Sequence, residues 1–199
     1  MTDIYVDGDA CPVREEVYRV AARLKVKVLV VSNGSRPIRP PGISNVSMVL
    51  VGDTADAADD WIAARIGTTD VCVTSDIPLA SRCLKKAARV VSPTGKQWTE
   101  ANIGNALAGR EMAQHLRELG TITRGPAPLT KGDRSRFLGA LDTALQAALR
   151  EGREAERAFL SSIRRSHPVL SPVSAASWIR HGGRWFRTSG SAHDKPFPR

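Results

Sequence analysis

The sequence has no long hydrophobic run. No stretch approaches the ~20 consecutive apolar residues that a membrane-spanning helix needs, so no membrane span is expected. The segment from Met1 to Asp7 lacks the basic flank and the cleavage site of a signal peptide, and we expect it to form a strand. Cysteine is also scarce. Cys11, Cys72 and Cys83 do not have the spacing of a metal site, and a cytoplasmic chain with unpaired thiols explains them most simply.

Several common functional motifs are missing. Neither a Gly-x-Gly-x-x-Gly sequence nor a P-loop is present, which argues against dinucleotide or nucleoside triphosphate binding through those loops. None of the four histidines follows a predicted strand, so a histidine-based mechanism is not expected.

Acidic residues are fewer than basic ones, and the formal net charge is +9. Residues 1–150 hold 20 Lys and Arg against 16 Asp and Glu, whereas residues 151–199 hold 9 against 4. The last quarter of the chain therefore supplies more than half of the excess. Such a balance favours non-specific attraction to polyanions, and a solvated basic surface explains it equally well.

Short β-branched runs alternate with segments of helical periodicity, which predicts βαβ units and a parallel sheet. Strands are expected at residues 3–6, 27–31, 46–51, 70–74 and 88–91. One helix should hold Pro12 in its first turn, one should have Asp53 or Thr54 as its N-cap, and one should hold Pro78 in its first turn. Two long helices are expected at residues 99–119 and 131–150.

The composition changes after Glu156. Residues 161–199 are rich in Ser, Pro, Gly, Arg and His and show no sustained period, which predicts a disordered tail. Trp178 and Trp185 leave a short binding segment as the alternative. We therefore expect a folded domain over residues 1–156 and a basic tail over residues 157–199.

Acidic residues follow three of the predicted strands. Asp7 and Asp9 follow the first strand, Asp56 and Asp59 follow the third, and Asp76 follows the fourth. The carboxyl ends of parallel strands share one rim of the sheet, where ligands of open α/β sheets bind. Carboxylates gathered there repel one another unless a cation intervenes, and hard oxygen ligands suit Mg²⁺ or Mn²⁺. The sequence therefore predicts a divalent-metal site at this rim.

Polar residues that could bind a substrate phosphate lie at the same rim. These candidates are Asn33, Ser35, Arg36, Thr74 and Ser75. The segment from Asn33 to Arg36 is equally typical of an ordinary glycine turn, and helix capping would be a sufficient explanation of Asp53 and Asp76.

Five motifs, in this order, resemble the bacterial YaiI/YqxD family, whose function is unassigned. They are Val6-Asp7-Gly8-Asp9-Ala10-Cys11-Pro12, Asp56-Ala57-Ala58-Asp59, Thr74-Ser75-Asp76-Ile77-Pro78-Leu79-Ala80, Ser92-Pro93-Thr94-Gly95 and Gly125-Pro126-Ala127-Pro128. The resemblance covers about residues 3–145. The family is similar to PIN-like domains, which implies a three-layer α/β/α sandwich with a mainly parallel, Rossmann-like sheet. Two C-terminal helices and the tail would follow that sheet.

The resemblance implies a divalent-metal-dependent nuclease in which water attacks a phosphodiester of RNA or another nucleic acid. Asp7 and Asp76 would be the catalytic residues and the primary metal ligands, with Asp9, Asp56 and Asp59 assisting. The basic residues that could hold the nucleic-acid backbone are Arg14, Arg36 and Arg39.

Two other functions remain open. In the first, the basic tail binds nucleic acid and the acidic residues are not catalytic. In the second, Asp7-x-Asp9 is the nucleophile motif of a small-molecule phosphohydrolase, because it is similar to that of haloacid-dehalogenase-type enzymes. Those enzymes also need a downstream lysine, for which Lys85 or Lys86 is available.

Overall fold

The main sheet is parallel except at one edge. A computed structural model describes residues 1–9, 11–34, 38, 41–54, 56–119, 127–166, 178–181 and 184–187. Its larger sheet consists of β1 (Asp3–Asp7), β2 (Lys27–Ser32), β3 (Val46–Leu50), β4 (Val71–Val73), β5 (Arg89–Val91) and β6 (Gln97–Trp98). The spatial order is β3-β2-β1-β4-β5-β6, with β6 antiparallel to β5 and all the other pairs parallel. This is the strand order of doubly wound, Rossmann-like sheets, so the predicted sheet is confirmed.

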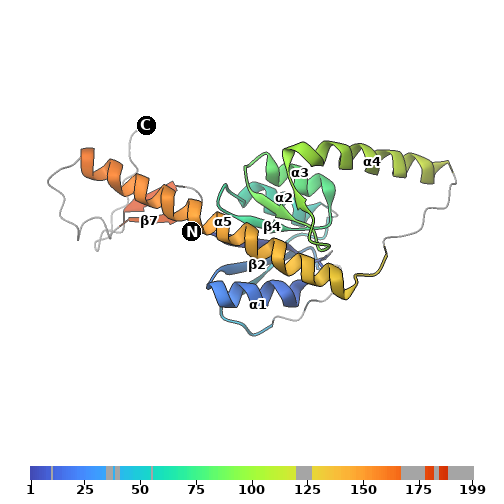
Figure 1. Ribbon diagram of the computed structural model, residues 1–199, viewed down its shortest axis with the longest axis horizontal. Coiled ribbons are helices and arrows are strands. Elements are labelled where there is room, and N and C mark those ends of the chain that lie inside the picture. The colour runs from blue at the N-terminus through green and yellow to red at the C-terminus, as the bar shows by residue number, and fades with distance from the viewer. Residues whose placement is uncertain are drawn as a thin grey trace.

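Helices cover both faces of this sheet. They are α1 (Arg14–Leu24), α2 (Ala57–Arg65), α3 (Ile77–Leu84), α4 (Glu100–Glu118) and α5 (Lys131–Ser166). Helices α1 and α5 lie on one face, and α2, α3 and α4 lie on the other (Figure 1). The domain is therefore the three-layer α/β/α sandwich that the family resemblance implies.

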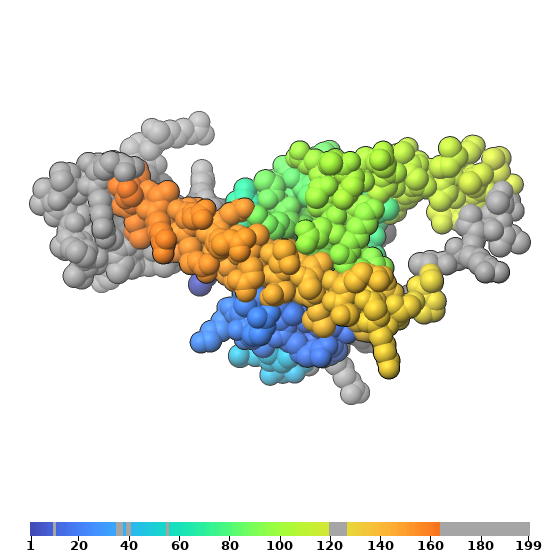
Figure 2. Space-filling view, viewed as in Figure 1, coloured from blue at the N-terminus to red at the C-terminus, as the bar shows by residue number. Residues whose placement is uncertain are grey.

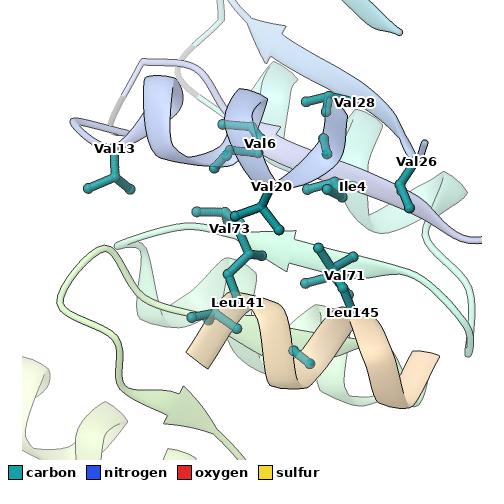
Figure 3. Packing of buried hydrophobic residues seen from close by; sticks show 14 of the residues in the cluster. Ile4, Val6, Val13, Val20, Val26, Val28, Val71, Val73, Leu141 and Leu145 are labelled. Carbon is teal, nitrogen blue, oxygen red and sulfur yellow. The ribbon is translucent and has the colours of Figure 1, made fainter. Parts of the chain in front are cut away.

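Side chains along each strand point alternately to the two helical layers. In β1, Ile4 and Val6 pack towards α1 and α5, whereas Tyr5 packs on the side of α2 and α3. Both faces are covered, which explains why β1 and β2 are apolar at successive positions. Figure 3 shows the core on the α1 and α5 side, where Val20 of α1 and Leu141 and Leu145 of α5 belong to one cluster with side chains of the strands.

Helix α2 begins later than predicted. Asp56, and not Asp53 or Thr54, precedes its first residue. The amide of Ala57 donates a hydrogen bond to the carbonyl of Thr54 at 3.1 Å, and this bond closes a turn before the helix. The first helical bond runs from the amide of Asp60 to the carbonyl of Asp56 at 2.8 Å. Asp53, Thr54 and Asp56 are all residue types that favour the N-cap position, so residue type alone does not determine which of them precedes the helix.

The antiparallel edge strand β6 is not predicted by the sequence analysis. It forms because the turn from Ser92 to Gly95 reverses the chain, with the Gly95 amide donating to the Ser92 carbonyl at 2.9 Å. Gly95 has a φ of +85°, and a Cβ atom there would lie 2.6 Å from the backbone carbon of Arg136 on α5. This turn therefore packs directly against the α5 backbone, which only glycine allows.

Helix α5 is longer than predicted, because it continues beyond Arg150 to Ser166. Residues 157–166 of the predicted tail are accordingly helical, and three of these ten residues are arginine, which favours helices. Farther along, β7 (Trp178–His181) and β8 (Arg184–Arg187) pair as an antiparallel hairpin. The rest of the predicted tail lies outside the described residues, and the domain boundary at residue 156 stays a prediction.

Two predictions about composition can be compared with the structure. Cys11, Cys72 and Cys83 are all free thiols, as expected, and all three are buried. None of the helices in the described part of the chain is long and apolar enough to cross a membrane.

Candidate functional site

The candidate site lies where the strand order of the sheet reverses. The chain leaves β1 and β4 in opposite directions along the sheet, so their adjacent carboxyl ends form the switch point at which α/β sheets bind ligands. Asp7 ends β1, and Thr74 follows β4. The Thr74 hydroxyl donates a hydrogen bond to Asp7 Oδ2 at 3.0 Å, and both residues are buried. Thr74 therefore orients the Asp7 carboxylate.

Asp76 begins α3. Its Oδ2 atom accepts a hydrogen bond from the Leu79 amide at 2.9 Å, so the capping role that the sequence left open is present. Its Oδ1 atom accepts a hydrogen bond from Nη1 of Arg110 on α4 at 2.6 Å. Both oxygens of this carboxylate thus have a donor in the structure.

Arg110 is the residue that the sequence analysis missed. Ile103, Ala106 and Leu107 of α4 pack into the core beside α3, and Arg110 follows on the same helical face. Helical periodicity could have placed Arg110 on that face. Helical periodicity could not have identified Asp76 as the partner of Arg110, because that pairing depends on how α4 docks against α3.

Asp59 lies in the first turn of α2 and is half-buried. Burial is the largest cause that raises its pKa, from an ordinary value of 3.8 to about 7. The charges of Asp7, Asp76 and Asp56 raise the pKa further, in that order, while Arg82 lowers it. Four of the five predicted metal ligands are therefore close enough to interact electrostatically, although their segments are far apart in the sequence.

Asp9, the fifth predicted ligand, is engaged at the end of β2. Its Oδ1 accepts a hydrogen bond from the Ser32 hydroxyl at 2.6 Å, and its Oδ2 accepts one from the Asn33 amide at 2.9 Å. Asp9 thus holds the start of the loop that follows β2. Asn33, predicted to bind substrate, contributes its backbone amide to this contact.

The other predicted binding residues have different environments. Ser75 is exposed beside Thr74. The Arg14 guanidinium donates a hydrogen bond to the Gly8 carbonyl at 2.6 Å, which ties α1 to the loop after β1. The remaining predicted contacts, Ser35, Arg36 and Arg39, lie outside the described residues.

The acidic residues suit a hard divalent ion by their chemistry. Carboxylate oxygens are the ligands that Mg²⁺ and Mn²⁺ prefer, and a cation would relieve the repulsion that raises the pKa of Asp59. In the described part of the chain, no three His, Cys, Asp or Glu side chains converge as ligands of one ion. The five aspartates proposed as metal ligands therefore stay a prediction.

Comparison with known proteins identifies the family. A family model described as "Uncharacterized BCR, YaiI/YqxD family" matches residues 5–147. The chain belongs to the YaiI/YqxD family. It is 55% identical over 157 residues to a UPF0178 protein of Rhodospirillum centenum, an alignment that covers 77% of this chain and 100% of the relative. A UPF0178 protein of Paramagnetospirillum magneticum is 53% identical over 150 residues, which cover 75% of this chain and 98% of the relative. No solved structure matches the chain.

The YaiI/YqxD match contains the whole candidate site. Asp7, Asp76 and Arg110 all lie within the matched residues, as do Asp56 and Asp59. The C-terminal part of α5 and both strands of the hairpin lie beyond the match. The site thus belongs to the part of the chain that defines the family.

Proposed function

We propose that this YaiI/YqxD protein is a divalent-metal-dependent phosphodiesterase that acts on RNA or another nucleic acid. The observation that carries the proposal is the placement of Asp7 and Asp76 after the adjacent strands β1 and β4, where Thr74 contacts both residues. Asp59 lies near enough for their charges to raise its pKa, to which burial contributes most. Carboxylates that repel one another at the switch point of an α/β sheet lower the stability of the metal-free protein. A cation that binds among them relieves this repulsion, and the relief contributes to the affinity of the cation. Elevated carboxylate pKa values of this kind cluster at functional sites.

The residues have distinct roles in this proposal. Asp7 and Asp76 would hold the ion, and Asp56 and Asp59 would assist directly or through water. Mg²⁺ or Mn²⁺ would polarise a phosphoryl oxygen and lower the pKa of a bound water. The hydrogen bond from Thr74 fixes the orientation of Asp7, a task that neighbouring donors commonly perform for metal-binding carboxylates. Asp9 supports the site by holding the loop after β2.

Two arguments support a nucleic-acid substrate. Similarity of the family to PIN-like domains implies phosphodiester hydrolysis. The net charge of +9 favours association with polyanions despite the acidic site. The proposal therefore assigns the acidic residues to the chemistry and the positive net charge of the chain to substrate attraction.

Thermal unfolding of the full chain with and without Mg²⁺ or Mn²⁺ tests the metal site. An ion that binds the native state at 100 times its Kd adds about 2.7 kcal/mol of stability and raises the Tm. Asp7→Asn should abolish this rise, because it preserves the shape of the side chain and removes the charge. Asp53→Asn, an exposed acid before α2, is the matched control and should keep the rise. Absence of a metal-dependent rise in the wild-type protein contradicts the proposal.

Cleavage of a fluorescent single-stranded RNA tests the reaction. Wild-type protein should cleave it only with Mg²⁺ or Mn²⁺, and both Asp7→Asn and Asp76→Asn should be inactive while remaining folded. Unchanged turnover by Asp7→Asn would remove Asp7 from the mechanism. Metal binding without cleavage would leave the metal site and reject this substrate.

A further inference from the structure

We infer that the hairpin of β7 and β8 is a binding platform for single-stranded nucleic acid, on which tryptophans stack with bases and arginines contact phosphates. The inference rests on the proposed function for the class of substrate, and it adds a second contact that is separate from the acidic site. The juxtaposition that carries it is the repeated pairing of tryptophan with arginine across the two strands.

The register of the hairpin repeats one kind of pair. Trp178 lies opposite Arg187, and Trp185 lies opposite Arg180. Residues two apart in a strand fall on the same face of a sheet, so these four residues share one face. The two tryptophans are diagonal neighbours on that face, at positions about 7–8 Å apart in an antiparallel ladder. Aromatic and cationic residues therefore alternate on this face, both along each strand and across the pair.

Single-stranded nucleic acid is the polymer whose chemistry fits this face. Every base has a π-face that can stack on an aromatic ring, and every linkage has a phosphate that can pair with a guanidinium. A single strand exposes both groups, whereas a duplex keeps its bases stacked on one another. The alternation of tryptophan with arginine therefore favours single strands over duplexes.

The charge of this part of the chain favours the same partner. Residues 157–199 contain eight Lys and Arg and one acidic residue, whereas residues 1–156 contain 21 Lys and Arg and 19 acidic residues. The segment that includes the hairpin thus supplies most of the net charge of +9. Among the eight residues of β7 and β8, three are arginine and none is acidic. The hairpin is therefore complementary in charge to a polyanion.

The distribution of residues over the two faces argues against a membrane as the partner. The second face of the hairpin consists of Ile179, His181, Arg184 and Phe186. A segment that lies on a membrane segregates its apolar residues onto one face. Here each face has two apolar or aromatic residues and two that are arginine or histidine. Neither face is wholly apolar, as insertion into lipid requires.

Helix α5 leads the chain away from the acidic rim before the hairpin. Near its start, Arg134 donates hydrogen bonds to Glu16 of α1 and to the carbonyl of Pro12, in the segment that follows β1. Farther along, Gly152 lies beside Thr2, which precedes β1. The helix thus runs from the carboxyl ends of the strands to their amino ends, and its last part extends beyond the sandwich (Figures 1 and 2). The chain therefore leaves the domain at the end opposite the acidic site.

Fluorescence anisotropy of a fluorescein-labelled oligothymidylate, titrated with the full chain in EDTA, tests the platform. EDTA removes divalent ions, so neither metal binding nor cleavage contributes to the signal. Trp178→Leu and Trp185→Leu should each weaken binding at least about fivefold, because each removes one stacking partner. Trp185→Phe keeps an aromatic ring and should recover most of the affinity. Phe186→Leu, the same kind of change on the other face, is the matched control and should change the affinity less than twofold.

The salt dependence of binding distinguishes phosphate contacts from stacking. Arg180→Gln should reduce the slope of log K against log salt concentration by about one, because one phosphate contact is lost. Trp185→Leu should weaken binding and leave the slope unchanged, since stacking releases no counterions. A duplex of the same length should bind more weakly than the single strand and should not respond to Trp185→Leu.

The outcomes distinguish this inference from the proposed function. If the tryptophan variants bind the strand as the wild type does, the platform is overturned and the metal site is unaffected. If Asp7→Asn weakens binding as much as Trp185→Leu, the strand is held at the acidic site and the platform is again overturned. Tighter binding to vesicles of phosphatidylcholine and phosphatidylserine than to the strand, lost in the same tryptophan variants, overturns it in favour of a membrane. A loss confined to Trp178 and Trp185 supports the platform, whether or not the protein binds Mn²⁺ or cleaves RNA.

Discussion

Replacing Asp59 with asparagine should stabilise the metal-free protein above neutral pH. The pKa of Asp59 is raised from 3.8 to about 7 in the folded chain, first by burial and then by Asp7, Asp76 and Asp56. Between these two values the folded state holds a proton that the unfolded chain has released. The free energy of unfolding therefore falls as the pH rises from about 4 to about 7, and the loss is complete above that range. Asparagine has nearly the same shape and no charge, so the variant avoids this loss.

The size of the effect follows from the pKa shift and the exposure of the side chain. A shift of about three pKa units corresponds to about 4 kcal/mol if it is converted directly. Asp59 is only half-buried, and screening by water reduces the expected gain to about 1–2 kcal/mol. For a chain of this size, 1 kcal/mol shifts the Tm by about 2–4 °C. We expect the variant to melt about 3–6 °C higher at pH 8 and close to the wild type at pH 4.

Thermal unfolding followed by circular dichroism, in EDTA and across pH 4 to 8.5, measures this difference. Asp60→Asn is the control, because Asp60 is the next residue on α2, is exposed and is paired with Arg82. It should produce no gain at any pH. An Asp59→Asn variant that is no more stable than the wild type at pH 8, or a gain that does not depend on pH, would refute the electrostatic reasoning.

Three further substitutions test contacts that support the fold and the site. Gly95→Ala should lower the free energy of unfolding by at least about 2 kcal/mol in urea titrations, because φ is +85° and the new Cβ atom would meet the α5 backbone. Thr74→Val should cost about 1.5–3 kcal/mol in the same assay, since it leaves the buried Asp7 carboxylate without that donor. Thr130→Ala should cost about 1 kcal/mol, because the Thr130 hydroxyl accepts from the Asp133 amide at 3.1 Å and caps α5. A loss below 0.5 kcal/mol would contradict each of these arguments.

Much of the fold could be predicted because both faces of the sheet are covered. Burial on both faces requires continuous apolar strands such as β2, and Pro78 marks the first turn of α3 by its fixed φ. Pro12 lies just before Val13, the N-cap of α1, and not in the first turn of that helix as predicted. Shorter elements escaped this reasoning. Strand β6 has two residues, too few to show a period, and the turn before it packs on the α5 backbone, a contact between distant segments that local sequence does not reveal.

The sequence predicts the location of the candidate site better than it predicts the contacts between its side chains. Topology alone brings Asp7 and Asp76 to one rim, because parallel strands end at the same edge. Side-chain partners are not determined by topology. The bonds that engage Asp9 at the end of β2, and the pairing of Asp76 with Arg110, depend on loop conformation and on the docking of α4.

The position of α5 has a consequence for synthesis on the ribosome. Phe137, Leu141 and Leu145 of this helix are fully buried and belong to the same core cluster as the buried residues of α1. Figure 3 shows Leu141 and Leu145 in that core. All the strands of the main sheet precede them in the chain. A nascent chain that has just released β6 therefore exposes a hydrophobic sheet face until α5 emerges, and such surfaces are prone to aggregate or to attract chaperones. We therefore expect this domain to complete its folding only after α5 has emerged from the ribosome.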